Sequence, residues 1–278
     1  MQNTFFSRPP LGFLPRLFSA TCTLVVAVAL GSGAGMVTQA QAGEAGIKLD
    51  RAPMDKATDI LALQRGAKLF VNYCLNCHGA QSMRFNRLKD IGLTDEQIKT
   101  NLLFTGEKVG ELMTVAITRK DAKDWFGAAP PDLSVIARAK GSADGSGADW
   151  LYTYLRTFYR DASRETGWNN LVFNNVGMPH VLYEMQGEQR AVFAKVPDPH
   201  DQTKTKEVFE KFEITKPGAM NKLAFDNAMG DLTGFLVWMG EPDAAFRKQL
   251  GVLVLLFLGL LLLPCAWWLN HTYWKNLH

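Results

Sequence analysis

The sequence has little cysteine and little net charge. Only four of its 278 residues are cysteine, and two of these, Cys22 and Cys265, lie inside apolar stretches. A zinc site built on the two remaining cysteines would lack further ligands. The scarcity of cysteine therefore disfavours a zinc site. The net charge is only +3, which argues against nucleic acid as a partner. The chain also has no internal repeat and no stretch whose composition requires disorder.

The two remaining cysteines belong to the run Cys74-Leu75-Asn76-Cys77-His78, the attachment signature of a c-type haem. Two thiols three positions apart on one turn can each form a thioether with a porphyrin vinyl group. The histidine that follows can then donate a ring nitrogen to the iron. A redox-active dithiol is the competing interpretation, but it needs no histidine directly after the pair. The run therefore predicts one covalently attached haem c, held by Cys74 and Cys77, with His78 as an axial ligand.

The first 42 residues contain only two charges, Arg8 and Arg16. Ala20 to Leu30 forms a short apolar core, and Ala40-Gln41-Ala42 offers the small-x-small pattern of a cleavage site. Because this core is too short to span a membrane comfortably, we expect residues 1–42 to be a cleaved signal peptide. Cleavage would lower the net charge from +3 to +1, and two haem propionates would bring it to about −1.

A long apolar run near the C-terminus has the length of a membrane span. Leu250 to Leu269 is free of charge, and at 1.5 Å per residue it covers about 30 Å, the thickness of the hydrocarbon core of a bilayer. A basic pair precedes the run and an aromatic belt surrounds its far end, as membrane interfaces favour: Arg247, Lys248, Trp267, Trp268, Tyr273 and Trp274. We expect residues 247–270 to be a transmembrane anchor and residues 271–278 a short cytoplasmic tail, with Cys265 an inert thiol facing the membrane.

Residues 43–246 have the length of one soluble domain. Helical spacing predicts a helix over Asp59–Tyr73 whose apolar stripe leads directly to Cys74. Gly66 lowers the propensity of this helix, which close approach of another helix would compensate. Residues 104–127 show little periodicity and are expected to form loops around the haem. Capping, turn and periodicity signals predict further helices and one pair of strands: helices beginning at Thr94, over 130–140, 148–159 and 226–240, and strands Arg190–Val196 and Val208–Ile214. The predicted fold is mainly α, a cytochrome-c-like haem domain with a small β-hairpin and a C-terminal transmembrane helix.

Iron that only carries electrons needs a second axial ligand, usually methionine or histidine. Met178 fits best, because it lies in an irregular, aromatic-rich stretch and Pro179 stiffens the backbone after it. A thioether there would favour ferrous iron and raise the redox potential. Most methionines are core residues, however, and local arguments leave three other candidates open: Met113, Met185 and His180.

A series of short motifs follows in a characteristic order: Arg65-Gly66, Phe70, Cys74 to His78, Ser82-Met83-Arg84-Phe85, Ala129-Pro130-Pro131-Asp132-Leu133-Ser134, Met178-Pro179, Asp231-Leu232, Phe235-Leu236 and Glu241-Pro242. In this order they resemble the cytochrome c1 family, the haem-c subunit of the ubiquinol–cytochrome c oxidoreductase. The haem motif alone would fit any c-type cytochrome. The Met-Arg-Phe, Pro-Pro-Asp-Leu-Ser and Glu-Pro elements make the resemblance specific.

The resemblance implies roles for several residues. Met178 would be the distal ligand, and the Pro130-Pro131 turn would lie against the haem, where we expect a carbonyl to accept the Nδ1 proton of His78. Arg119 stands roughly where the family has an arginine beside a haem propionate. Two departures matter. The segment before Pro130 is shorter than in mitochondrial relatives, and His180 replaces a proline found in many relatives, which leaves a His/His ligand pair open.

The function that the resemblance implies is one-electron transfer, with no bond chemistry by the subunit itself. It would take electrons from a Rieske iron–sulfur protein and pass them to a cytochrome c acceptor, beside a cytochrome b partner. Export predicts a single-pass protein of the bacterial inner membrane, with the haem domain in the periplasm and the C-terminus in the cytoplasm. Two other classes stay open: a free-standing anchored cytochrome serving a dehydrogenase or terminal oxidase, and a haem enzyme or gas sensor with an open sixth position.

Overall fold

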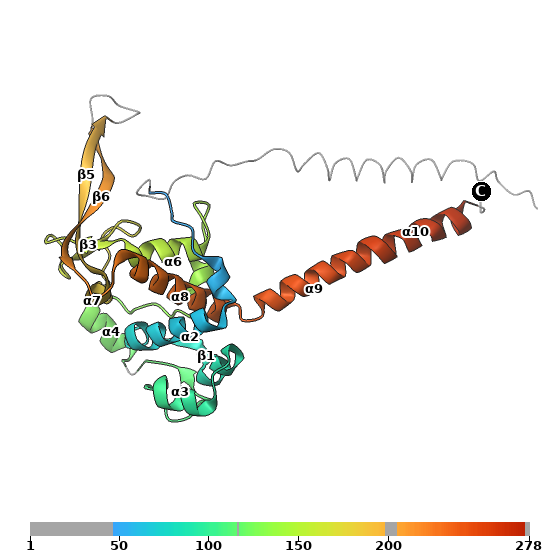
Figure 1. Cartoon of the computed structure of the whole chain (residues 1–278), viewed down its shortest axis with the longest axis horizontal. Coiled ribbons are helices and arrows are strands. Elements are labelled where there is room, and N and C mark those ends of the chain that lie inside the picture. Colours follow the sequence, from blue (N-terminus) through green and yellow to red (C-terminus); the bar gives the residue numbers. More distant parts are fainter. Residues whose placement is uncertain (1–46, 116, 198–204, 276–278) are drawn as a thin grey trace, which may run out of the picture. The chain divides into compact units, whose positions relative to one another are not determined.

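The computed structural model describes residues 47–115, 117–197 and 205–275. The predicted signal peptide and the last three residues of the predicted tail lie outside the described residues. Helices predominate, as the sequence predicts (Figure 1). The α-helices are α2 (Ile60–Leu69), α3 (Asp95–Asn101), α4 (Arg119–Phe126), α5 (Ile136–Ala139), α6 (Gly147–Arg156), α7 (Tyr183–Gln186), α8 (Lys222–Gly240), α9 (Ala244–Phe257) and α10 (Leu263–Leu269). Shorter turns are the 3₁₀ segments η1 (Met54–Ala57) and η3 (Phe85–Ile91), and the π-helical segments η2 (Phe70–Cys74), η4 (Leu258–Leu262) and η5 (Asn270–Trp274).

Helix α2 leads into the haem motif. Its N-cap is Asp59, whose carboxylate accepts the backbone N–H of Leu61 at 2.9 Å, and it buries Leu63 and Ala67. The predicted helix continues to the expected end, but its last turn widens into the π-helical η2, closed by a bond from Leu75 N to Phe70 O of 3.0 Å. Such wide turns are common at functional sites.

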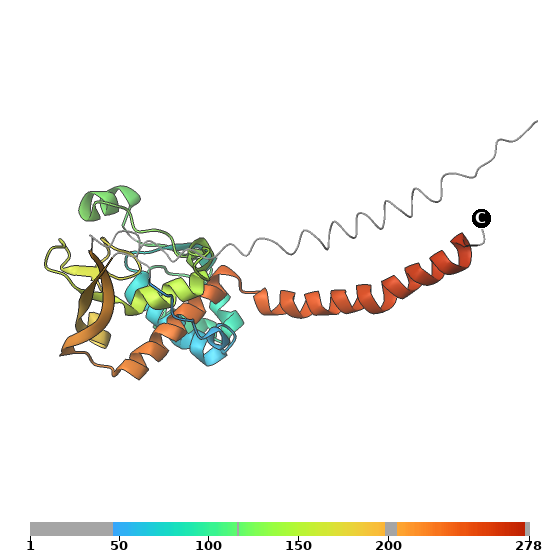
Figure 2. The same ribbon diagram turned by 90° about the horizontal axis from the view of Figure 1, so that it is seen from above.

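Helices α2, α6 and α8 lie side by side in both ribbon views (Figures 1 and 2). The close approach predicted at Gly66 is confirmed. A Cβ atom there would lie 2.2 Å from the carbonyl oxygen of Asp231 and 2.7 Å from Cβ of Phe235, both on α8. Only glycine allows the two backbones to come this close.

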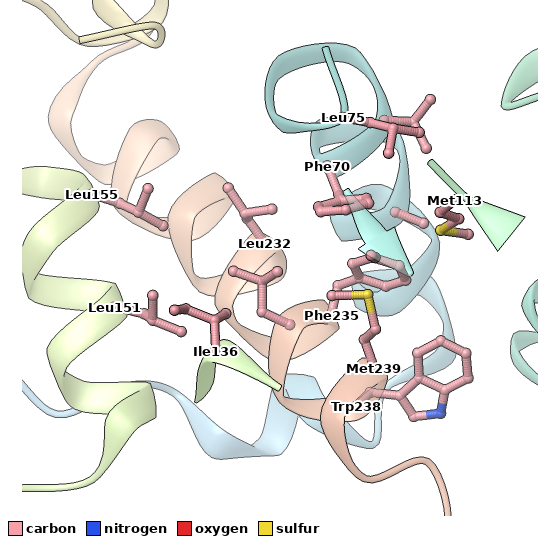
Figure 3. Close-up of a cluster of buried hydrophobic side chains, with 14 of the residues drawn as sticks. Phe70, Leu75, Met113, Ile136, Leu151, Leu155, Leu232, Phe235, Trp238 and Met239 are labelled. Carbon is pink, nitrogen blue, oxygen red and sulfur yellow. The ribbon is translucent and has the colours of Figure 1, made fainter. Parts of the chain in front are cut away.

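The hydrophobic core lies between these helices. The rings of Phe70 and Phe235 are 5.5 Å apart at their centres, and both side chains are fully buried. Figure 3 shows them among apolar side chains from several elements: Leu75, Met113, Ile136, Leu151, Leu155, Leu232, Trp238 and Met239. Met229 and Met239 are buried on α8, as expected for packing residues.

A buried carboxylate ties the first helices to α8. Asp231 is 4% exposed, and it accepts from Lys56 Nζ and from Arg65 Nε, each at 2.6 Å. Two cations therefore compensate one buried anion, which desolvation requires. This cluster fixes η1 and α2, and with α2 the haem motif, against α8.

The described part of the chain also contains three two-stranded antiparallel sheets: β1 (Ala80–Arg84) with β2 (Leu112–Met113), β3 (Phe158–Arg160) with β4 (Trp168–Asn170), and β5 (Gly187–Pro197) with β6 (Thr205–Pro217). The predicted hairpin is confirmed as β5 and β6, and it is longer than its apolar alternation suggests. The two smaller sheets escaped the sequence analysis because strands of two to five residues carry too short a pattern.

Two predicted stretches need correction. Residues 104–127 are not all loop, since they contain β2 and α4. Thr118 caps α4 by accepting the N–H of Asp121 at 3.1 Å, but the helix buries only Ala122, so it has no apolar stripe to reveal it. The helix expected over 130–140 is reduced to α5 (Ile136–Ala139), because the residues before it bond to His78 and to residues 79–82 instead.

The boundaries of two other helices shift. Helix α8 begins at Lys222 instead of residue 226, with Asn221 as its N-cap. Helix α6 ends at Arg156, where the chain turns into β3. The predicted capping box at Thr94 and Gln97 is confirmed at the start of α3.

One continuous helical stretch, Ala244–Trp274, is long and apolar enough to cross a membrane, and it is the one such candidate among residues 47–115, 117–197 and 205–275 (Figure 2). The π-helical η4 lies just before Pro264. Proline cannot donate a backbone N–H and crowds the preceding turn, and a local widening of the helix accommodates both effects.

Candidate haem-binding site

The cysteines and histidine of the haem motif lie on one tight turn. The backbone N–H groups of Cys77 and His78 both donate to the carbonyl oxygen of Cys74, at 3.1 and 2.8 Å. Asn76 Nδ2 closes the turn from outside by donating to Asn72 O at 3.0 Å. Local hydrogen bonds therefore preset the spacing that two thioethers and one axial ligand require.

The imidazole of His78 has a defined orientation. Its Nδ1 lies 2.8 Å from the carbonyl oxygen of Pro131. The carbonyl can only accept, so Nδ1 carries the proton and Nε2 keeps its lone pair for a metal. Burial lowers the pKa of His78, against smaller opposite effects of Pro131 and Asp132, which favours the neutral ring that a ligand needs. Within the expected Pro130-Pro131 turn, the accepting carbonyl is that of Pro131.

Pro131 is held in place by the residues that follow it. Asp132 Oδ2 accepts the N–H of Gln81 at 2.8 Å, Leu133 N donates to Gly79 O at 2.8 Å, and Ser134 Oγ accepts the N–H of Ser82 at 3.0 Å. The Pro-Pro-Asp-Leu-Ser stretch is thus bonded along the whole segment just after the haem motif. Asp132 and Ser134 thus hold this turn in place, a role that their motif in the sequence did not reveal.

The cysteine pair does not have the properties of a redox dithiol. Burial, and to a smaller extent the neighbouring Cys77, raise the pKa of the Cys74 thiol to about 12. A reactive dithiol needs the opposite shift. No group of three His, Cys, Asp or Glu side chains able to hold a metal ion occurs in the described ranges. The donors fit a c-type haem: two thiols and one oriented imidazole on a single turn.

Met178 lies half-buried against the same core as Cys74. Its sulfur accepts a hydrogen bond from the Tyr154 hydroxyl on α6 at 3.3 Å. The ring of Tyr154 stacks on Trp150, with centres 4.8 Å apart, and meets the edge of Phe158 at 5.0 Å. Local sequence patterns do not single out Tyr154. A tyrosine at helical spacing from other aromatic residues predicts only a packing position in the core.

The loop that carries Met178 is shaped by two buried asparagines. Asn170 Oδ1 accepts the N–H groups of Val172 and Phe173 at 2.9 and 3.2 Å, while its Nδ2 donates to Tyr154 O at 2.8 Å. Asn169 Oδ1 accepts the N–H of Asn175 at 2.9 Å. Side-chain amides of this kind substitute for regular backbone pairing, so the irregular stretch around Met178 has a defined course.

The other candidate ligands are all buried. Met113 and Met185 are 0% and 6% exposed and belong to the core. His180 is 2% exposed, and it stacks on Phe158 with centres 4.8 Å apart and meets Trp168 at 5.0 Å. Two aromatic neighbours thus hold His180, and with it the Met178-Pro179 segment.

Two further features are Arg119 and a groove beside the β5–β6 hairpin. Arg119 is exposed in the first turn of α4. A groove of about 770 Å³ runs beside the β5–β6 hairpin, lined by residues such as Arg156, Phe212 and Asp226. None of Cys74, His78 and Met178 lines it, so it is separate from the candidate haem site.

A cysteine pair followed by an imidazole with a free Nε2, in a mainly helical domain, defines a c-type cytochrome. The comparisons with known proteins agree. Residues 51–191 match the model of the Cytochrome C1 family. A cytochrome c1 of Allochromatium vinosum is 40% identical over 95% of this chain and 99% of its own length. The chain belongs to the cytochrome c1 family, so it carries one covalently bound haem c and is a c-type cytochrome of the bc1 complex.

Two other relatives show the breadth of the similarity. A protein of Nitrosomonas europaea named ammonia monooxygenase gamma subunit is 50% identical over 84% of this chain and 90% of its own length. A cytochrome c1 of Rhodospirillum rubrum is 28% identical over 82% of this chain and 90% of its own length.

Proposed function

We propose that this chain carries single electrons from a Rieske iron–sulfur protein to a cytochrome c acceptor within a quinol:cytochrome c oxidoreductase. The observation that carries the proposal is the haem-motif turn with His78 oriented by Pro131, in a chain of the cytochrome c1 family. The subunit catalyses no bond chemistry itself. Its task is to hold a one-electron centre in place.

Haem c, when bound, supplies the one-electron couple. In this proposal Cys74 and Cys77 would attach the porphyrin, and His78 Nε2 and Met178 Sδ would be the two protein ligands of the iron. The Pro131 carbonyl holds the proton on Nδ1 and thereby fixes the tautomer. A thioether ligand favours ferrous iron, which places the potential above that of the quinol pool. By resemblance to the family, Arg119, which is exposed in the first turn of α4, would lie beside a haem propionate.

The proposed topology follows from the predicted signal peptide, which would export the domain that comes after it. Residues 1–42 are a cleaved signal peptide, residues 43–246 the periplasmic haem domain, residues 247–270 the anchor, and residues 271–278 a cytoplasmic tail in the bacterial inner membrane. The exposed apolar helix from Ala244 to Trp274 supports the anchor. Beside it in the membrane, the partner would be a cytochrome b.

The Nitrosomonas relative raises a second assignment, an electron-carrying subunit of an ammonia monooxygenase. A free-standing anchored cytochrome is a third. Both would keep the haem site described above and would differ in the partners of the chain. The match to the Cytochrome C1 family over residues 51–191 favours the oxidoreductase.

The test is a reduced-minus-oxidised optical spectrum of the protein, purified in mild detergent through a tag after His278. Bands of both c-type and b-type haem would support the oxidoreductase. A c-type band alone would favour the free-standing carrier, and co-purifying ammonia oxidation would favour the monooxygenase. Absence of a c-type band, from a host able to attach haem c, would contradict the assignment at Cys74 and Cys77.

A further inference from the structure

The structure places a hydrogen-bond donor on the sulfur of Met178. The hydroxyl of Tyr154 lies 3.3 Å from Met178 Sδ, and Tyr154 is only 9% exposed. We infer that Tyr154 is a positioning residue that donates its proton to this thioether and thereby raises the redox potential. The inference rests on the proposed role of Met178 as an iron ligand.

The position of the hydroxyl is fixed from several sides. The indole of Trp150 stacks on the Tyr154 ring at an angle of 12° between planes, and Phe158 meets the ring at 69°. The backbone of Tyr154 is held as well, since its carbonyl oxygen accepts from Asn170 Nδ2 at 2.8 Å. Asn170 also shapes the loop that leads to Met178. One buried side-chain amide therefore helps to position both Tyr154 and the Met178 loop.

The buried hydroxyl of Tyr154 has the Met178 sulfur as its hydrogen-bond acceptor. A thioether is a weak acceptor, and a buried hydroxyl without any partner is costly. Donation to the sulfur directs the positive end of the O–H dipole toward the sixth position. That dipole favours the oxidation state with the lower positive charge, which is the ferrous one. Removing the hydroxyl should therefore lower the midpoint potential.

The same helix offers a matched control. Tyr152 lies two residues from Tyr154, and its ring packs under the guanidinium of Arg156, with 4.3 Å from the guanidinium carbon to the ring centre. Phenylalanine at this position keeps that cation–π contact. Tyr152→Phe thus removes a hydroxyl from α6 without touching the Met178 loop.

The experiment is a spectroelectrochemical titration of the detergent-purified holoprotein with Tyr154→Phe, Tyr152→Phe and no substitution. We expect Tyr154→Phe to keep the c-type spectrum and the near-infrared band of methionine-ligated ferric haem. Its one-electron equilibrium constant should shift about threefold toward the oxidised form, which is about 28 mV at 59 mV per tenfold change. Tyr152→Phe should leave the potential unchanged.

A second experiment makes the Tyr154 hydroxyl a stronger hydrogen-bond donor and keeps it in place. Site-specific 3-fluorotyrosine at position 154 has a more acidic hydroxyl and nearly the same shape, so it should raise the potential. This arm stands even if Tyr154→Phe fails to fold. If neither Tyr154→Phe nor 3-fluorotyrosine at position 154 changes the potential, the inference is overturned and the ligand assignment stays intact. If the methionine band instead persists in every variant, including Met178→Leu, then Met178 is not the ligand. The inference would fail together with that assignment.

Discussion

The carbonyl oxygen of Pro131 lies 2.8 Å from Nδ1 of His78, although the two residues are 53 positions apart in the sequence. This contact depends on the residue after Pro131. Asp132 accepts the backbone N–H of Gln81 through Oδ2 and that of Ser134 through Oδ1, at 2.8 and 2.9 Å. The aspartate therefore joins the proline turn to the strand that follows the haem motif.

Asp132→Ala should destabilise this junction. Two backbone donors lose their acceptor, and because the site is partly solvated we expect a cost of about 1–2 kcal/mol. Thermal unfolding of the holoprotein, followed by circular dichroism, measures the effect. Asp124→Ala on the exposed face of α4 is the control and should stay within about 0.5 kcal/mol. Equal stability of the two variants would count against a role of Asp132 in holding the turn.

Met178→Leu should remove the distal ligand while preserving the volume of the side chain. Since axial ligand identity sets haem potentials over a range of about 0.8 V, we expect a fall on the order of 100 mV. The ferrous protein should also bind carbon monoxide, because the sixth position opens.

Met185→Leu is the matched control, because Met185 is buried in the core at 6% exposure and such a swap costs less than about 1.5 kcal/mol. Its potential and its lack of carbon monoxide binding should match the unsubstituted protein. If Met178→Leu behaves in the same way as this control, Met178 does not ligate the iron.

Gly66→Ala should force α2 and α8 apart. The added Cβ would lie 2.2 Å from the Asp231 carbonyl oxygen, and overpacking of this kind costs about 1–3 kcal/mol or more. Gly110→Ala meets nothing within 4 Å, so its free energy of unfolding should change little. Chemical denaturation of both variants compares them directly, and a stable Gly66→Ala variant would show that the helices can separate without penalty.

Acid should weaken the contact between α6 and α8. Burial by itself would raise the pKa of Asp226, but hydrogen bonds from Arg156 Nε and Lys222 Nζ, each at 2.6 Å, hold that pKa below its ordinary value. The ionised carboxylate thus contributes stability above the unfolded pKa of about 3.9, and this contribution is lost as the pH falls through the folded pKa.

The measurement is the difference in unfolding free energy between the unsubstituted protein and Asp226→Asn across the acid range. We expect a constant difference at neutral pH that shrinks below about pH 4. A difference independent of pH would mean that the charge of Asp226 contributes nothing to folding.

Local patterns in the sequence were sufficient for several features. The haem motif, the helix before it, the capping box at Thr94 and the apolar C-terminal helix all depend on residues close together in the chain, where spacing translates directly into geometry. Other features were missed or misplaced for the opposite reason. Helix α4 buries a single residue and so has no stripe, and the stretch after Pro131 bonds to β1 in place of continuing a helix.

By itself the sequence determined which residues can carry the chemistry, because a turn of five residues sets Cys74, Cys77 and His78 against one another. Only the tertiary structure decided how those groups are oriented. The Pro131 carbonyl, the Tyr154 hydroxyl at Met178 and the packing of Gly66 on Asp231 all join residues far apart in the chain. Such contacts exist only once the helices have packed, and no local pattern encodes the distance between them.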